Sequence, residues 1–264
     1  MAGETRRRFM QQTLAASALA ATLASDGRAA GSAAGAASAV PAATPAMPAS
    51  GGAMPAASAA PAFDLVLAPK PLPFDPKSLH GISEKLIVSH WENNYTGAVK
   101  ALNAIRGRLA AAAADASTPP YVYTGLKREQ LLRTGSVVYH EHYFGNLGGS
   151  GSAGARLRSL IARSFGSYDA WENEFCKIGN GLAGGSGWAV LSWNPTLRVL
   201  ENHWLGDHAH GTATSVPILV MDMYEHAYQM DYGAAAAKYV DAFFASVQWD
   251  VVEARAAAAG VPGA

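Results

Sequence analysis

Four side chains in this 264-residue chain, three histidines and one aspartate, are of types that bind metal ions. Each lies in a predicted helix or at the junction of a predicted strand and helix. Asp222 precedes His226 by four residues in VMDMYEHAYQMDY, where an apolar run ends and a helix is expected to begin. His90 and His140 fall in two predicted helices, His90 on an apolar face. Imidazole and carboxylate ligands together suit manganese, iron or zinc. Three His and one Asp would leave a position for solvent or substrate.

Each of these residues also has an ordinary structural explanation. A histidine buried in a helix is more often a hydrogen-bonded core residue than a ligand, and Asp222 with His226 would form an ion pair at a helix start. Cys176 is the only cysteine, which excludes an internal disulfide framework and any thiolate-rich metal site. A zinc-dependent hydrolase is a further interpretation, although no nucleophile or general-base motif accompanies the four residues.

Two long helical patterns carry the first two histidines. The first runs from Ser83, a favourable N-cap, to about Ala114, with apolar residues near the helical period and no proline. After the DASTPP break, the second runs from about Lys127 to Phe144. The residues of the second helix expected to face the first are Leu131, Leu132, Val138 and His140. Two helices joined by a short break predict an antiparallel hairpin domain over residues 69–147.

A Gly/Ser-rich stretch, GNLGGSGSAG at residues 145–154, is the predicted boundary after the hairpin. Two helical stretches follow, the second with Ser167 as its cap, and then short β-favouring runs that Asn194-Pro195 and the LGDHAHG loop separate. The chain then returns to helix. The predicted fold class is therefore α+β, with an N-terminal antiparallel helical hairpin followed by a mixed α/β domain at residues 155–264 that contains a small antiparallel sheet.

The first residues have the layout of an export signal, assigned to residues 1–30. Arg6 and Arg7 precede Phe9 and a short uncharged Ala/Leu run, an arrangement similar to the twin-arginine signal that a receptor reads. A basic amphipathic start is the alternative. Residues 31–68 are rich in Ala, Pro, Ser and Gly and predict a disordered tether. We expect an exported protein of the periplasm or cell envelope, in contact with membrane only through an uncleaved signal.

The charge balance argues against a nucleic-acid partner. Lys plus Arg and Asp plus Glu each number 20, so the formal net charge is zero. A chain without a basic excess has no general attraction for the phosphate backbone.

Four segments resemble the iron/manganese superoxide dismutase family. DMYEHAY is similar to the family's D-x-W-E-H-A-Y motif, with Tyr224 where tryptophan is usual. SHWENNYTGAVKALN and HEHYFGNL resemble the two ligand-bearing helices, and GGSGWAVL resembles G-S-G-W-x-W-L. The resemblance extends from about Pro69 to Arg255.

The resemblance implies one manganese or iron ion per chain, held by His90, His140, Asp222 and His226 and completed by water or hydroxide. It implies dismutation of superoxide to dioxygen and hydrogen peroxide, and a homodimer with Glu225 at the interface. The alternative is a metal-binding envelope protein of this fold with weak or no dismutase activity. Sequence leaves open manganese against iron, and dimer against tetramer.

The chain departs from the family in the residues around the metal. The active-site glutamine of the family would fall at Ser136 or near Gly206, and neither position holds one. His208 is the predicted replacement, and His210, in the same LGDHAHG loop, is the alternative. The family's gateway tyrosine falls on Ala98, and Tyr95 is the candidate to supply the missing phenol. Trp188 aligns with an aromatic residue that lines the metal pocket.

Overall fold

The structure, a computed structural model, describes residues 61–264, which lie within one compact unit. The predicted signal (1–30) and most of the predicted tether (31–68) lie outside the described residues. Helix α2 (Pro61–Asp64) is followed by an extended segment. The backbone N–H of Leu67 donates to the Asn103 side chain at 3.0 Å, and the Asn103 amide donates to the Leu67 carbonyl at 2.9 Å. Contact with the hairpin therefore begins before Pro69.

The first predicted helix is present but is not a uniform α-helix. After the short helix η1 (Pro76–Ser78), the Ser83 hydroxyl accepts the Leu86 N–H and caps α3, as its type and position predicted. The segments that follow one another without a break are α3 (Glu84–Ser89), the π-helix η2 (His90–Tyr95) and α4 (Thr96–Ala114). The wider π-helical turn is typical of functional sites, and here it begins at His90.

The second helix, α5 (Pro120–Gly145), differs from its prediction in two ways. It starts at Pro120 rather than at Lys127, because proline is well tolerated at the first helical position, where its missing N–H has no helical partner to lose. The expectation that Leu131 and Val138 face the first helix was wrong, since they are 56% and 38% exposed. The buried residues of α5 are instead those that pack against α4 and against the sheet, among them Ser136, Val137 and His140.

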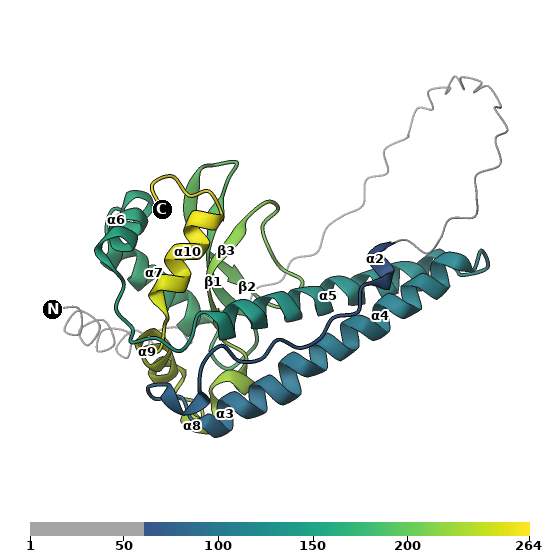
Figure 1. Cartoon of the computed structure of the whole chain (residues 1–264), viewed down its shortest axis with the longest axis horizontal. Helices are drawn as coiled ribbons and strands as arrows, with labels where there is room; N and C mark the ends of the chain where they lie inside the picture. The colour runs from purple at the N-terminus through teal and green to yellow at the C-terminus, as the bar shows by residue number, and fades with distance from the viewer. Residues whose placement is uncertain (1–60) are drawn as a thin grey trace, which may run out of the picture. The chain divides into compact units, whose positions relative to one another are not determined.

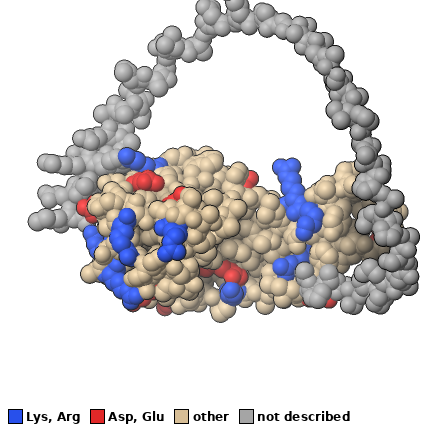
Figure 2. All heavy atoms as spheres, turned by 90° about the horizontal axis from the view of Figure 1, so that it is seen from above, with Lys and Arg blue, Asp and Glu red and all other residues tan. Residues whose placement is uncertain are grey.

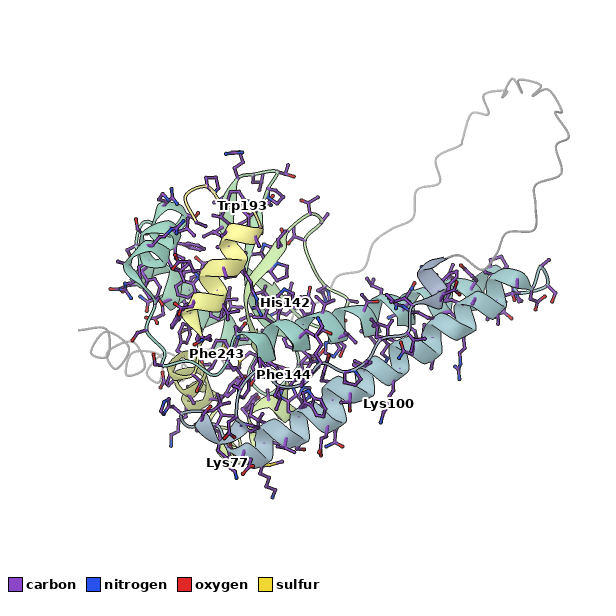
Figure 3. The ribbon with its side chains drawn as sticks, in the orientation of Figure 1. Lys77, Lys100, His142, Phe144, Trp193 and Phe243 are labelled. Carbon is purple, nitrogen blue, oxygen red and sulfur yellow. The ribbon has the colours of Figure 1, made fainter. Side chains whose placement is uncertain are left out.

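Helices α4 and α5 lie side by side as the predicted antiparallel hairpin (Figure 1). One end of the hairpin projects away from the rest of the unit, and the other end packs against the sheet (Figure 1). Figure 3 shows Phe144 and Phe243 where the sheet end of α5 meets the C-terminal helices. The ligand-type residues of the hairpin therefore lie at its buried end.

The second part contains the predicted small sheet. The Ser167 hydroxyl caps α7 by accepting the Ala170 N–H at 3.0 Å, as predicted. The three strands are antiparallel in the order β2-β1-β3, with β1 in the centre. The bounds are α6 (Ala155–Phe165), α7 (Tyr168–Gly181), β1 (Trp188–Asn194), β2 (Val199–Leu205) and β3 (Val216–Asp222). The predicted fold class is confirmed.

The predicted return to helix is divided into shorter elements. They are η3 (Glu225–Ala227), α8 (Gln229–Tyr232), α9 (Ala236–Ala245) and α10 (Trp249–Ala258). Gly233, at φ 52°, separates α8 from α9 because the left-handed conformation there suits glycine. Helix α7 packs over β1 and β2, and α10 packs against β3. Helix α5 of the hairpin also packs against β3, so helices from both halves of the unit contact the sheet.

Asn146 joins the end of α5 to the edge of strand β3 that pairs with no other strand. Its side-chain oxygen accepts the Val220 N–H at 3.0 Å and an Arg255 N–H at 3.2 Å, and its amide donates to the Tyr143 carbonyl at 3.0 Å. Because β3 pairs only with β1, the Val220 N–H would otherwise be unpaired. This fully buried side chain therefore fixes β3 against α5.

On the face shown in Figure 2, lysine and arginine occur in separated groups among acidic and uncharged residues. Among the described residues, no helix combines enough length with enough apolar character to cross a membrane.

Replacing Asn146 with leucine should destabilise the protein by about 2–4 kcal/mol, because it leaves buried donors at Val220 and Arg255 without their acceptor. Urea unfolding followed by tryptophan fluorescence would measure the change. Asn93→Ala is the matched control, since Asn93 is exposed and bonds only within its own helical turn; its effect should stay within about 0.5 kcal/mol. Equal effects of the two substitutions would contradict the assignment.

Candidate metal centre

His90 occupies the first position of the π-helix and is 1% exposed. Its ring lies 4.9 Å from that of Phe144 and 5.2 Å from that of Tyr143. Neither ring nitrogen has a hydrogen-bond partner among the described residues. Burial lowers the pKa of His90, so the imidazole is neutral near pH 7. A buried, neutral imidazole without a partner is available as a ligand.

His140 is held on α5 in one tautomer. Its Nδ1 lies 2.7 Å from the Ser136 carbonyl oxygen, which can only accept, so Nδ1 carries the hydrogen. The lone pair is therefore on Nε2, which has no hydrogen-bond partner among the described residues. Burial and the neighbouring His90 lower the pKa of His140 to about 3. Such an orienting bond to the far nitrogen is typical of metal-bound histidine.

Asp222 ends β3 with no exposed surface, and His226 follows on η3. Asp222 Oδ1 accepts the Tyr224 N–H at 2.8 Å, which leaves Oδ2 directed at the histidines. Burial alone would raise the pKa of Asp222, but the adjoining His226 and His90 side chains outweigh it and hold the pKa well below its usual range. The carboxylate is therefore ionised.

The four ligand-type side chains meet at one point, although they come from three distant parts of the sequence. Asp222 Oδ2 lies 3.2 Å from His90 Nε2, 3.7 Å from His140 Nε2 and 3.3 Å from His226 Nε2. One donor atom from each of the four residues lies within 4.8 Å of the others. Three imidazole nitrogens and one carboxylate oxygen are a donor set that suits first-row transition metals. The unpartnered nitrogens show that the residues fit a metal ion.

His208 lies beside this group, in the loop after β2. The Trp188 indole N–H donates to His208 Nδ1 at 3.1 Å, so the hydrogen of the neutral His208 ring is on Nε2. The His208 ring stacks on Tyr224 with centroids 4.6 Å apart and lies 5.9 Å from the His140 ring. Burial lowers the pKa of His208. The structure thus brings two predicted residues, His208 and Trp188, to the edge of the site.

His210, the alternative to His208, is exposed and pairs with Asp207 at 2.7 Å. Tyr95 is buried with its ring 6.3 Å from that of His140, but its hydroxyl donates to Glu141 at 3.0 Å and accepts the Lys70 N–H at 2.9 Å. To act directly at the metal, the Tyr95 hydroxyl would have to give up its hydrogen bond to Glu141.

The residue that supports the Asp222 backbone, Tyr239, was not predicted. The Tyr239 hydroxyl donates to the Asp222 carbonyl oxygen at 2.8 Å and lies 3.2 Å from the Tyr143 hydroxyl. Both tyrosines are fully buried, and burial raises both pKa values, so they remain protonated. A buried hydroxyl needs a partner, but the sequence gives no signal that identifies which one Tyr239 takes.

A helical hairpin joined to an α/β layer, with three histidines and one aspartate at their junction, defines a class of mononuclear metalloprotein. The comparisons with known proteins specify the class. Residues 153–255 match the family described as iron/manganese superoxide dismutases, C-terminal domain.

Relatives that match more than two thirds of the chain agree with the domain match. The chain is 51% identical over 191 residues to an iron superoxide dismutase of Cupriavidus metallidurans, covering 72% of this chain and 96% of the relative. It is 35% identical to an iron superoxide dismutase of Aquifex pyrophilus, covering 68% and 86%. It is 32% identical to a manganese superoxide dismutase of Halobacterium salinarum, covering 69% and 91%. The chain belongs to the iron/manganese superoxide dismutase family.

His140→Ala should lower the affinity for manganese or iron by about 100-fold or more, because the loss of a ligand exceeds the usual effect of an outer-shell change. Metal content after dialysis, measured by mass spectrometry, would test it. His142→Ala is the control, since His142 lies on the same helix and bonds to the Val138 carbonyl outside the four-residue group. Full metal retention by His140→Ala would remove this residue from the ligand set.

Proposed function

We propose that the protein is an exported superoxide dismutase that binds one iron or manganese ion through His90, His140, Asp222 and His226. The observation that carries this function is the convergence of four donor atoms within 4.8 Å in a largely buried site of a chain of this family. When bound, iron or manganese supplies reversible one-electron redox chemistry at this point.

The chain's own residues must hold the ion and manage protons. Two superoxide ions and two protons give one dioxygen and one hydrogen peroxide, so proton supply is part of the reaction. His90 and His140 offer lone pairs because burial keeps them neutral. Asp222 offers the single negative charge. The packed rings of Phe144 and Trp188 exclude water from the sides of the site.

We assign His208 as the donor that replaces the missing glutamine. Trp188 occupies Nδ1 of His208, so the Nε2–H remains for a hydrogen bond to solvent or to a bound anion. Ser136, where a helix-borne glutamine would stand, is too short for that role, and its hydroxyl lies 3.4 Å from Nδ1 of His140.

The activity is tested by loading the purified protein separately with manganese and with iron and measuring superoxide consumption. Metal-dependent consumption is the expected result, and comparison of the two forms shows which ion supports turnover. Tight metal binding without turnover would instead identify a metal-binding envelope protein. A zinc-dependent hydrolase would be favoured by one result alone, which is the presence of zinc in the natively purified protein.

His208→Ala should lower turnover by about 10-fold to 100-fold while metal content is kept, because a hydrogen-bond donor is lost and no ligand is removed. His208→Gln should recover part of the loss, since an amide can also donate. His210→Ala should resemble the unchanged protein. If His208→Ala kept full turnover, the donor would have to be another group.

Export rests on Arg6, Arg7 and the apolar run that follows them. Replacing both arginines with lysine should leave the protein in the cytoplasmic fraction of a host that has the twin-arginine pathway. Unchanged export would contradict a twin-arginine signal.

A homodimer through Glu225 is supported by the exposure of this part of the site. Glu225 is exposed on η3, and the adjoining His226 side chain is 25% exposed, so a second copy there would complete its burial. Light scattering should show a dimer that Glu225→Ala weakens and that the exposed control Glu84→Ala does not. A monomer at micromolar concentration would rule out this assembly.

A further inference from the structure

Gly135 lies inside α5, where glycine is less favourable than alanine. A Cβ atom built at this position would lie 1.7 Å from the backbone oxygen of His208 and 2.9 Å from its carbonyl carbon. These atoms are backbone, so they cannot move aside as the end of a flexible side chain can. The loop that carries His208 therefore packs directly on the helix backbone, and only glycine permits this approach.

Tyr139, one helical turn later, holds the same loop at a second point. Its hydroxyl donates to the His210 carbonyl oxygen at 2.8 Å. Within the loop, Asp207 Oδ1 accepts the N–H groups of Ala209 at 2.7 Å and His210 at 3.2 Å, which closes the turn. The backbone around His208 is thus fixed between Gly135 and Tyr139.

The neighbouring positions on α5 face the metal site. Ser136 accepts the Nδ1–H of His140, and His140 directs Nε2 at Asp222. Gly135 and Ser136 are adjacent, as are Tyr139 and His140. Helix α5 therefore positions the ligand-type ring through Ser136 and His140, and it positions the loop through Gly135 and Tyr139. The rings of His140 and His208 lie 5.9 Å apart.

We propose that Gly135 is a positioning residue for His208, with Tyr139 as its partner, and that it sets how closely the His208 ring approaches the metal site. The inference rests on the role proposed above for His208. A side chain at position 135 would displace the His208 backbone away from α5 and weaken the hydrogen bond that the His208 Nε2–H would donate to solvent or to a bound anion. Displacements on the order of 1 Å can lower a rate by about 100-fold.

The test compares Gly135→Ala with Gly125→Ala in the iron-loaded protein. Gly125 lies on the same helix, and a Cβ there would meet nothing within 4 Å. Gly135→Ala should keep its iron, lose turnover by about 10-fold or more, and change the affinity for azide in an optical titration of the ferric protein. Gly125→Ala should match the unchanged protein in all three measurements. If Gly135→Ala also matched it, the proposal would be overturned.

A double variant separates positioning from a general effect on the fold. If Gly135 acts through His208, adding Gly135→Ala to His208→Ala should change neither azide affinity nor turnover further. A full additional loss would show that Gly135 acts elsewhere. Should Gly135→Ala fail to fold, Tyr139→Phe removes only the hydroxyl that bonds to His210, and unchanged azide affinity in that variant would overturn the proposal. Azide affinity is measurable without dismutation, so a failure of the proposed activity is recognised separately.

Discussion

A buried carboxylate enclosed by three imidazole rings is the constraint on which this structure depends. Asp222 is fully buried, and burial keeps the adjoining His90 and His140 neutral. Removing an ionised carboxylate from water is costly unless its charge is paired. A di- or trivalent cation at the meeting point of the four side chains removes that cost, and the histidine lone pairs then become ligands instead of unpaired polar atoms. The family assignment and the chemistry of the site thus explain the same observation.

The neighbouring structure can be understood as the means of keeping Asp222 in place. Strand β3 ends at this residue and has only one neighbouring strand, so its other edge needs acceptors from elsewhere. Asn146 supplies one at Val220, and the Tyr239 hydroxyl donates to the carbonyl of Asp222 itself. These bonds connect β3 to the end of α5 and to α9. A shift of the hairpin against the sheet would break the bond at Val220 and would separate His140 from Asp222.

Much of the scaffold could be predicted because its signals are local. Ser83 and Ser167 cap helices where their type and position indicated, and the apolar runs separated by Asn194-Pro195 and the following loop form the three strands. The errors on α5 arose where position depends on packing. Leu131 and Val138 fit a helical period but not the face that contact with α4 and β3 selects. Periodicity gives the spacing of apolar residues along a helix. It does not say which face is buried when the helix packs against two neighbours.

The metal site likewise has features that could be predicted from local sequence and features that could not. His90, His140, Asp222 and His226 are identifiable because their motifs are distinctive, and the structure brings them together. The π-helical turn at His90 has no signature in its sequence, HWENNY, and the partner of Tyr239 depends on contacts between residues far apart in the chain. Gly135 was visible only as a glycine inside a predicted helix. Its meaning requires the position of the His208 backbone, which no local pattern supplies.

If His208 is the donor, as proposed, its place on a loop changes what controls the reactivity of the site. A glutamine on α5 would be fixed by the helix that also carries His140, whereas His208 depends on contacts between a loop and that helix. Imidazole also differs from an amide, because which nitrogen carries the hydrogen must be decided by a neighbour. The Trp188 N–H decides it here, since it occupies Nδ1 and leaves Nε2 as the donor. The buried tryptophan of β1 thus does more than fill the core, because it determines which nitrogen of His208 is free to donate a hydrogen bond.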